Sequence, residues 1–327
     1  MWDKVYGHEA NKKFLSSLLV GARRTPGLLF YGPEGVGKKL LALKVAQSFL
    51  CLEPLTTGEA CGKCQACKAF LAGGHPDFIH VSQLKDGKDI LIEQIKYVAK
   101  QSETAPQVSK YKVCIIEGAD FMNKFGANSI LKLIEEPPEY WLFILIATNR
   151  NRILPTILSR VIQLRFQGLP EDILIEMLAK GENLGRLYSR LAGGSLGRAQ
   201  SLIETNALEW RDRALALLVD LPHDTPVNYS EAGVDWLKKP VSKVEGLLFF
   251  EFLLYLLRDL IYIKENLFED IINIDKIPTL KRVEPKWSVN KLEEIILLVH
   301  DSHRAISQHT VVRSVVGRLI LTMNQRK

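Results

Sequence analysis

Apolar positions in the first half of the chain form short continuous runs, separated by stretches with helical spacing. Residues 27–31 and 141–147 are continuous apolar runs, residues 111–116 are apolar except for Lys112, and residues 161–166 alternate between apolar and polar side chains. All four are therefore predicted strands. Residues 39–50 carry apolar side chains at helical spacing. Strands that alternate with helices are typical of an α/β domain, a parallel sheet with helices on both faces.

No strand is predicted after Gly168. Helical spacing of apolar residues predicts helices at residues 171–180, 184–191, 196–204, 207–219, 241–266, 289–307 and 311–323. We therefore expect an α/β domain at residues 1–167, a small helical domain at residues 168–206 and a C-terminal all-helical domain at residues 207–327.

The composition excludes several classes of protein. Of the 327 residues, 47% are hydrophobic and 24% are charged, which is typical of a globular chain and excludes a disordered or low-complexity one. The most apolar stretch, residues 247–263, contains Glu251, Arg258 and Asp259 and is too interrupted to span a bilayer. The first residues lack the apolar segment of a signal peptide, so we expect a cytoplasmic protein.

The net charge of +6 lies in the C-terminal segment. Residues 276–327 hold 10 Lys and Arg against 4 Asp and Glu, whereas residues 1–275 hold 33 of each sign. We interpret these cations first as a solvated helix surface. A surface for an anionic partner such as nucleic acid is the second interpretation.

A glycine-rich loop follows the first predicted strand. It contains Gly32, Gly35, Gly37, Lys38 and Lys39 in the sequence GPEGVGKK, which matches G-x-x-x-x-G-K between a strand and a helix. In that context backbone N–H groups and the helix N-terminus hold phosphate oxygens, and the first lysine reaches the outer phosphates. The sequence therefore predicts a nucleotide-type phosphate loop.

Three positions depart from the pattern that hydrolysis requires. A hydrolysing loop has Ser or Thr after the lysine because the hydroxyl binds Mg²⁺, whereas Lys39 offers an ammonium with no lone pair. Glu117 follows an apolar run at a place where an Asp usually helps to hold Mg²⁺. Gly118 stands where a carboxylate usually orients the attacking water. We expect no ATP hydrolysis, and the sequence leaves open whether ATP still binds.

Four of the five cysteines lie within seventeen residues, at Cys51, Cys61, Cys64 and Cys67. In a chain without a secretion signal this spacing indicates a metal site rather than disulfides. Four thiolates suit tetrahedral Zn²⁺ and leave no open coordination position, so we expect a structural zinc ion. An iron–sulfur cluster is the competing interpretation. Cys114 lies in a predicted strand and is interpreted as a core residue.

Three further features resemble the bacterial clamp-loader subunits of the AAA+ class. They are NSILKLIEEPP at residues 128–138, Thr148 at the end of a predicted strand, and TILSR at residues 156–160. The resemblance, dense from Trp2 to about Ser201, implies an AAA+ P-loop domain, a helical lid and a C-terminal collar. It also implies that the cysteines form the zinc insertion of the gamma/tau and delta-prime subunits of DNA polymerase III, and that Thr148 belongs to the nucleotide site.

Departures from the motor pattern favour the delta-prime type over the gamma/tau type. A motor subunit would carry Ser or Thr at position 39, an acidic pair at positions 117 and 118, and Arg in a G-S-x-R motif, where this chain has Gly197 with Arg198 one place late. The resemblance then implies a stator-like subunit of the DNA polymerase III holoenzyme with no ATPase activity of its own. Its partners would be the gamma/tau motor subunits and the delta subunit. The sliding clamp and primed DNA would be reached through the complex, and no membrane is expected.

Arg160 is the residue to which the resemblance assigns a catalytic role. In the family this arginine projects into the ATP site of a neighbouring subunit, where a guanidinium neutralises the charge that spreads over the phosphoryl oxygens in the transition state. Val161 replaces the Cys that follows it in the family. The competing interpretation is that Arg160 pairs with a surface carboxylate.

Two other functions stay as alternatives. One is an active AAA+ ATPase of the gamma/tau motor type, which steady-state ATPase activity of the isolated chain would reveal. The other is a zinc-dependent nucleic-acid-binding protein with a relic phosphate loop, which strong and steeply salt-dependent DNA binding by the isolated chain would reveal.

Overall fold

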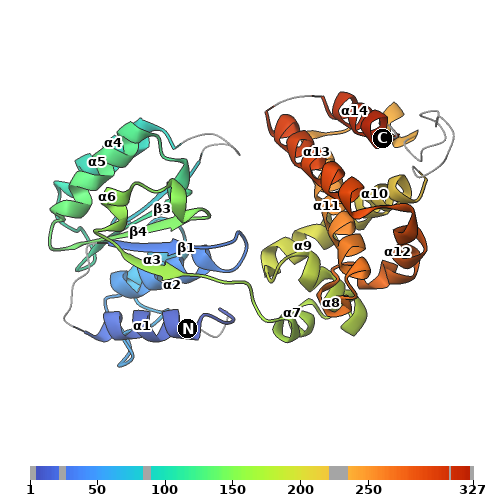
Figure 1. Ribbon diagram of the computed structural model, residues 1–327. Coiled ribbons are helices and arrows are strands. Elements are labelled where there is room, and N and C mark those ends of the chain that lie inside the picture. The colour runs from blue at the N-terminus through green and yellow to red at the C-terminus, as the bar shows by residue number, and fades with distance from the viewer. Residues whose placement is uncertain (1–4, 22–26, 84–89, 221–234, 309–310, 325–327) are drawn as a thin grey trace. The chain divides into compact units, whose positions relative to one another are not determined.

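A computed structural model describes residues 5–21, 27–83, 90–220, 235–308 and 311–324. Contacts within the chain divide it into two compact units (Figure 1), here called unit 1 (Met1–Pro170 with Gly194–Gly197) and unit 2 (Glu171–Gly193 with Arg198–Lys327). Trp2, where the sequence resemblance begins, and the last two cations, Arg326 and Lys327, lie outside the described residues.

Unit 1 is built on a parallel sheet of five strands in the order β2-β3-β4-β1-β5. The strands are β1 (Gly27–Tyr31), β2 (Phe78–Val81), β3 (Lys112–Glu117), β4 (Trp141–Ala147) and β5 (Ile162–Arg165). The three central strands are buried along nearly their whole length. Alternate residues enter two separate cores because helices cover both faces of the sheet. The parallel register therefore brings the carboxyl ends of β1, β3 and β4 to one edge.

Helices lie on both faces of this sheet (Figure 1). Buried residues of α1 (Glu9–Val20) and α2 (Lys38–Leu50) contribute to one core. Buried residues of α4 (Ile92–Ser102), α5 (Lys124–Glu135) and α6 (Pro155–Leu158) contribute to the other. Between α2 and β2 the chain makes an excursion, residues 51–74, that includes α3 (Gln65–Leu71) and is called the cysteine module below.

The predicted α/β architecture is confirmed. Each of the four predicted strands is present, with ends within one residue of those expected. The pattern does not predict β2, because this four-residue strand at the sheet edge is only partly buried and so lacks both a long apolar run and a clear alternation. It also does not predict α1, α3, α4 and α12 (Ile277–Val283).

Unit 2 is helical throughout its described residues. Besides α12, its helices are α7 (Glu171–Leu178), α8 (Glu182–Leu191), α9 (Leu196–Glu204), α10 (Leu208–Asp220), α11 (Lys243–Lys264), α13 (Val289–Ser307) and α14 (Val312–Asn324). All seven predicted helices are found, with ends within two residues of those expected. The centre of unit 2 is α11, whose Phe249, Phe250 and Phe252 are fully buried, as expected for a helix that is apolar on most of its surface.

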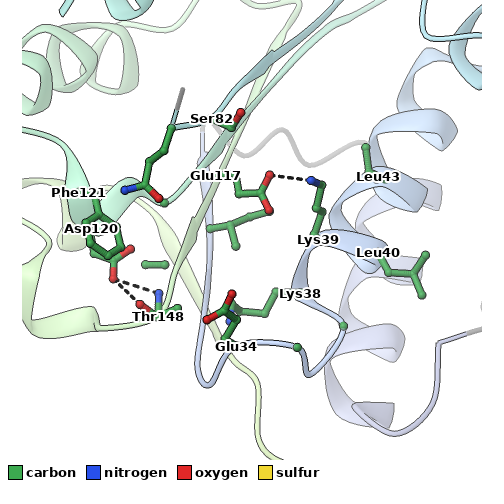
Figure 2. A pocket seen from close by; sticks show the side chains of 16 residues that line it. Glu34, Lys38, Lys39, Leu40, Leu43, Ser82, Glu117, Asp120, Phe121 and Thr148 are labelled. Atoms are coloured by element: carbon green, nitrogen blue, oxygen red, sulfur yellow. Dashed lines mark hydrogen bonds and ion pairs between the residues drawn. The ribbon is translucent and has the colours of Figure 1, made fainter. Parts of the chain in front are cut away.

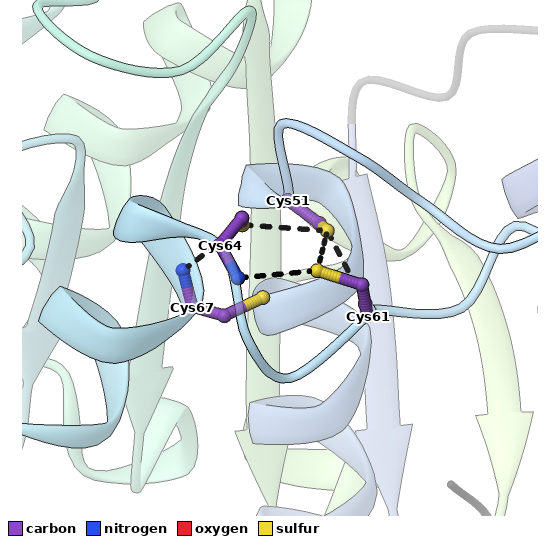
Figure 3. Close-up of side chains that lie close together, drawn as sticks. All are labelled: Cys51, Cys61, Cys64 and Cys67. Carbon is purple, nitrogen blue, oxygen red and sulfur yellow. Dashed lines mark hydrogen bonds between the residues drawn. The ribbon is translucent and has the colours of Figure 1, made fainter.

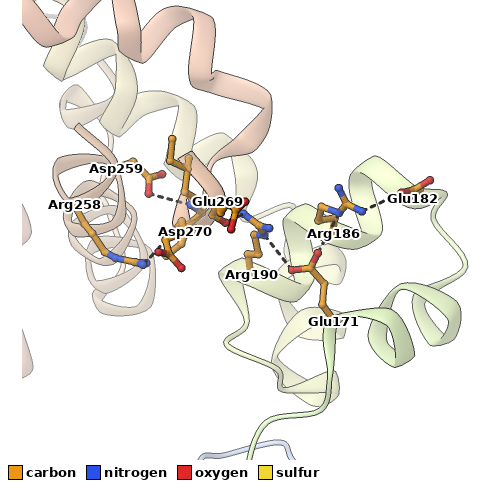
Figure 4. Close-up of polar contacts among 10 residues, drawn as sticks. Glu171, Glu182, Arg186, Arg190, Arg258, Asp259, Glu269 and Asp270 are labelled. Carbon is orange, nitrogen blue, oxygen red and sulfur yellow. Dashed lines mark hydrogen bonds and ion pairs between the residues drawn. The ribbon is translucent and has the colours of Figure 1, made fainter. Parts of the chain in front are cut away.

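Polar contacts join the short helices of unit 2 to the turn after α11 (Figure 4). Arg190 Nε donates to Glu171 Oε2 at 3.0 Å, and its Nη1 donates to the carbonyl oxygens of Glu269 at 2.9 Å and Ile271 at 2.6 Å. The fully buried Asp259 accepts hydrogen bonds from the backbone N–H groups of residues 272 and 273, at 3.0 and 2.8 Å. Because these contacts tie residues 171–191 to the turn, one unit contains both helical parts, and their division at residue 206 stays a prediction.

No helix in the described part of the chain has both the length and the apolar character needed to cross a membrane.

A buried polar network joins the two ends of the cysteine module. The Asp77 backbone N–H donates to His75 Nδ1 at 3.1 Å. His75 Nε2 therefore carries the ring proton and donates to Ser109 Oγ at 3.0 Å. The Ser109 hydroxyl in turn donates to the Leu50 carbonyl oxygen at 2.6 Å. Burial lowers the pKa of His75, although Asp77 acts in the opposite direction, and so favours the neutral ring that this network requires.

The Asp77 carboxylate secures the loop that leads into β3. It is 1% exposed and accepts hydrogen bonds from the backbone N–H groups of Gln107, Val108 and Ser109 at 2.6, 2.8 and 2.8 Å. Burial alone would raise the pKa of Asp77, but these three donors lower it below its ordinary value. The carboxylate therefore stabilises the fold in its ionised form.

We predict that Asp77→Asn lowers the free energy of unfolding by roughly 1–3 kcal/mol at pH 7, because an amide has one acceptor oxygen for three buried donors. The folded-state pKa lies below the unfolded value of about 3.9, so the contribution of Asp77 is complete above that value and is lost as pH falls through the folded-state pKa. The difference between Asp77→Asn and the unsubstituted chain should therefore narrow below about pH 4. Urea unfolding between pH 3 and 7 measures this difference.

The matched control is Asp301→Asn, which removes an exposed carboxylate on α13 and should change stability by less than about 0.5 kcal/mol. A constant difference between Asp77→Asn and the unsubstituted chain across this pH range would contradict the role given to the ionised carboxylate.

Candidate functional site

A cleft of about 890 Å³ lies at the edge where β1, β3 and β4 end (Figure 2). Six of the predicted nucleotide-site residues line it: Gly35, Gly37, Lys38, Lys39, Glu117 and Thr148. Gly32 is joined to them through a hydrogen bond from Lys38. The structure thus brings together residues that are more than a hundred positions apart in the sequence.

The backbone of the phosphate loop adopts conformations that glycine favours. Gly35 has φ 72° and Gly37, the N-cap of α2, has φ 98°, which are strained for other residues. At Gly32, a Cβ atom would lie 2.1 Å from the carbonyl oxygen of Phe166. In the described part of the chain, the N–H groups of residues 34–37 have no acceptor, so the loop offers donors for an anion.

The loop lysine is folded back onto the loop itself. Lys38 is 6% exposed, and its Nζ donates to the carbonyl oxygens of Gly32 at 2.6 Å and Pro33 at 2.5 Å. Burial lowers the pKa of Lys38, although the carboxylates of Glu34, Asp120 and Glu117 act in the opposite direction. Two of the three N–H donors of the ammonium are therefore used by the protein.

Lys39 forms an ion pair with Glu117 across the cleft. Its Nζ lies 2.8 Å from Glu117 Oε2, which also contacts His80 Nε2 at 3.0 Å, and Figure 2 shows Lys39 and Glu117 facing each other. The Lys39 ammonium therefore neutralises Glu117 Oε2, an oxygen that would otherwise attract a cation. The sequence does not indicate the part played by His80, because it lies on the unpredicted strand β2.

Asp120 fixes the end of β4 on the other side of the cleft. The carboxylate is 6% exposed, and its Oδ2 accepts from the Thr148 hydroxyl at 2.6 Å and from the N–H groups of Thr148 and Asn149 at 3.2 and 2.9 Å. The Thr148 hydroxyl is therefore committed to Asp120 (Figure 2). Sequence reasoning missed this role of Asp120, although its place just after a predicted strand and Gly118 was a signal.

The segment 194–197 of unit 1 contacts the phosphate loop directly. The Gly197 N–H donates to the Gly35 carbonyl oxygen at 3.1 Å, and a Cβ at Gly197 would lie 3.1 Å from Gly35 Cα. This close approach leaves little room for a side chain at position 197. Arg198 forms an ion pair with Glu251.

The four predicted metal ligands form one cluster in the cysteine module (Figure 3). Their sulfur atoms all lie within 4.8 Å of one another, and Cys51 Sγ lies 3.6 Å from Cys61 Sγ and 3.8 Å from Cys64 Sγ. A tetrahedral site with Zn–S bonds of about 2.3 Å requires sulfur separations of about 3.8 Å. The donor set and its spacing therefore fit a single zinc-sized ion held by these four residues.

Local backbone geometry prepares the cysteines for a metal. The N–H groups of Cys61 and Cys64 donate to Cys51 Sγ and Cys61 Sγ, both at 3.3 Å, and Gly62 turns the chain with φ 74°. Burial raises the pKa of Cys51 and Cys67. Burial also acts to raise the pKa of Cys64, but backbone donors, led by the Cys67 N–H, lower it to about 6. N–H donors of this kind stabilise thiolate, the form that binds metal.

Arg160 does not line the cleft. It follows α6, with its side chain 41% exposed, and its Nε lies 2.9 Å from Glu135 Oε1. Cys114 is fully buried in β3.

Comparison with known proteins gives consistent matches. Residues 7–170 match the family described as DNA polymerase III, delta subunit. DNA polymerase III subunit delta' of Pseudomonas aeruginosa is 37% identical over 55% of this chain and 56% of its own length. The subunit delta' of Bacillus subtilis is 27% identical over 96% of this chain and 95% of its own length.

A third relative is a DNA polymerase III subunit gamma/tau of Mycobacterium tuberculosis, 33% identical over 54% of this chain and 30% of its own length. The chain thus spans about half of the Pseudomonas relative, a third of the Mycobacterium relative and nearly all of the Bacillus relative. The family match covers half of the chain and the cleft residues described above. On this evidence the chain belongs to the DNA polymerase III delta subunit family.

Proposed function

We propose that this chain is a non-hydrolysing, stator-like subunit of the delta-prime type in the DNA polymerase III clamp loader. The observation that carries the proposal is the ion pair between Lys39 and Glu117, 2.8 Å apart, in a cleft with no acidic side chain at Gly118. In this role the chain helps to load the sliding clamp onto primed DNA as part of a complex with gamma/tau motor subunits and a delta subunit.

The cleft lacks two groups that hydrolysis requires. Phosphoryl transfer needs Mg²⁺ beside the outer phosphates and a group that orients the attacking water. The Lys39 ammonium supplies positive charge but no ligand for Mg²⁺, and it takes the Glu117 oxygen that would hold the ion. Gly118 has no side chain to orient water. Nucleotide binding would also require Lys38 to leave the carbonyl oxygens of Gly32 and Pro33.

Sequence identity supports membership of the complex but does not by itself choose the subunit type. The gamma/tau relative is 33% identical to this chain and the Bacillus delta' relative is 27% identical. The match to the delta' relative over nearly its full length favours that type. Lys39 and Gly118, in place of a metal-binding hydroxyl and a water-orienting carboxylate, favour it independently. A gamma/tau-type motor is the alternative, and ATPase activity distinguishes the two.

We assign two further roles within this function. Arg160 supplies a guanidinium to the ATP site of a neighbouring motor subunit, which its partly exposed position supports. Cys51, Cys61, Cys64 and Cys67 hold a structural Zn²⁺, which supplies no chemistry to a reaction because four thiolates close its coordination sphere. An AAA+ domain at residues 1–167, a lid at 168–206 and a collar at 207–327 complete the proposed organisation.

We expect the purified chain to hydrolyse no ATP above the level of a Lys38→Ala control. Lys39→Thr alone should not create activity, because it restores a hydroxyl for Mg²⁺ while Gly118 still lacks a carboxylate. Phosphate release at saturating ATP and Mg²⁺ is the measurement. Turnover that disappears in Lys38→Ala would favour the motor alternative.

We predict one zinc ion per chain, measured by elemental analysis of protein purified without chelators. Cys61→Ser should lower the zinc content, and chelation should expose the cysteine module to proteolysis because metal binding and folding are coupled in thiolate sites. The control is Cys114→Ala, which removes a buried thiol outside the cluster and should retain the metal. Iron in place of zinc, or no metal, would refute the assignment.

Arg160→Ala should lower DNA- and clamp-stimulated ATPase of the reconstituted complex while leaving its assembly intact. An arginine finger contributes roughly 10³–10⁵ to the rate at the site it serves, and a complex with several sites should lose part of its activity. Arg160→Lys should not restore it, since an ammonium lacks the planar fork. Arg165→Ala on β5 is an exposed control, and equal activities for Arg160→Ala and Arg165→Ala would remove the proposed role.

A further inference from the structure

Glu135, the last residue of α5, holds the guanidinium of Arg160. Arg160 Nε lies 2.9 Å from Glu135 Oε1. Arg160 Nη1 donates to the Thr156 carbonyl oxygen at 2.9 Å and to the Ser159 hydroxyl at 3.1 Å. Two of the three guanidinium nitrogens therefore have partners, and within the described residues Nη2 has none.

The backbone fixes the position of Glu135 at the end of α5. The helix ends at this residue because Pro137 and Pro138 follow, and the residue before a proline is pushed out of the helical conformation. Glu136 accordingly has φ −126° and ψ 63°. The turn is closed by a hydrogen bond of 3.0 Å from the Trp141 N–H to the Pro138 carbonyl oxygen. The prolines thus anchor Glu135 next to the first residues after α6.

We propose that Glu135 is a positioning residue for Arg160, which it holds through Nε so that Nη2 stays available to a neighbouring subunit. This inference rests on the proposed function, in which Arg160 reaches the phosphates of a neighbouring subunit. An arginine side chain loses considerable rotamer freedom when it is held in one geometry, and a guanidinium already oriented in the free subunit loses less on assembly. Because Glu135 binds Nε, the two N–H groups of Nη2 stay available as donors for a phosphoryl oxygen.

The contact is an exposed ion pair, so its effect is moderate. The side chains of Arg160 and Glu135 are 41% and 38% exposed, and pairs of this kind favour one geometry by roughly two- to fivefold. Glu136 is also exposed and borders the same surface hollow, but in the described part of the chain it forms no ion pair. It therefore provides a matched control for the loss of one negative charge.

The test is a double-mutant cycle on the reconstituted complex, with the full-length chain and its motor and delta subunits. DNA-stimulated ATPase at saturating ATP is measured for Glu135→Ala, Arg160→Ala and the double variant, with assembly checked by gel filtration. We expect Glu135→Ala to reduce the Arg160-dependent part of the rate by roughly two- to fivefold and to have no effect once Arg160 is absent. Glu135→Gln keeps an acceptor for Nε and should restore most of the rate, and Glu136→Ala should match the unsubstituted complex.

The outcomes separate this inference from the function on which it rests. If Arg160→Ala has no effect, the finger role fails and the positioning role fails with it. If Arg160→Ala lowers the rate but Glu135→Ala leaves it unchanged, raises it, or lowers it equally in the Arg160→Ala background, the finger role stands and the positioning role is overturned. Failure of Glu135→Gln to restore the rate would likewise count against positioning through this hydrogen bond.

Discussion

Burial of the parallel sheet on both faces is the constraint on which unit 1 depends. Apolar side chains of the central strands alternate between two cores, so a shift in register would misplace both cores at once. That fixed register sets the ends of β1, β3 and β4 at a common edge. The phosphate loop follows β1, Glu117 is the last residue of β3, and Thr148 follows β4. The cleft is therefore a consequence of how the sheet is packed.

Within the cleft, three charged side chains have partners from the protein. Lys38 contacts loop carbonyl oxygens, Lys39 contacts Glu117, and Asp120 contacts Thr148. Buried or partly buried charges are costly unless they are paired, so these internal contacts stabilise the cleft without a ligand. The close approach of Gly197 to Gly35 adds a backbone contact to the same loop. These contacts hold the phosphate loop, the end of β3 and the end of β4 in place around the cleft.

The sequence predicts those features whose signal is local. Long apolar runs mark the central strands, and the close spacing of the cysteines predicts the cluster that the structure confirms. It predicts poorly those features that depend on the order of strands or on contacts across the fold. The short edge strand β2 has a weak pattern, so the contact of His80 with Glu117 could not be foreseen.

Contacts between distant segments show the same limit. The EEPP sequence predicts the end of a helix, which is found, but the partner of Glu135 depends on how α5 and α6 pack against the sheet. The competing interpretation of Arg160 as the partner of a surface carboxylate describes a contact that is present in the isolated chain. The proposed role of Arg160 in a neighbouring ATP site concerns the assembled complex instead. Arg160 can bind Glu135 through Nε and still offer Nη2 to a neighbouring subunit. The two interpretations of Arg160 therefore do not exclude each other.

The hydrogen bonds at Ser109 have a consequence for how the cysteine module can vary. The module leaves the α/β core at Leu50 and returns at His75, and the same serine contacts both residues. Because the two ends meet at one buried point, the intervening chain is a closed loop, and the entropic cost of closing such a loop changes only slowly with its length. Changes of length in the exposed turns between these ends therefore cost little entropy. Loss of the whole module would be different, because Phe70 packs against the core of unit 1 and against Phe78 of β2.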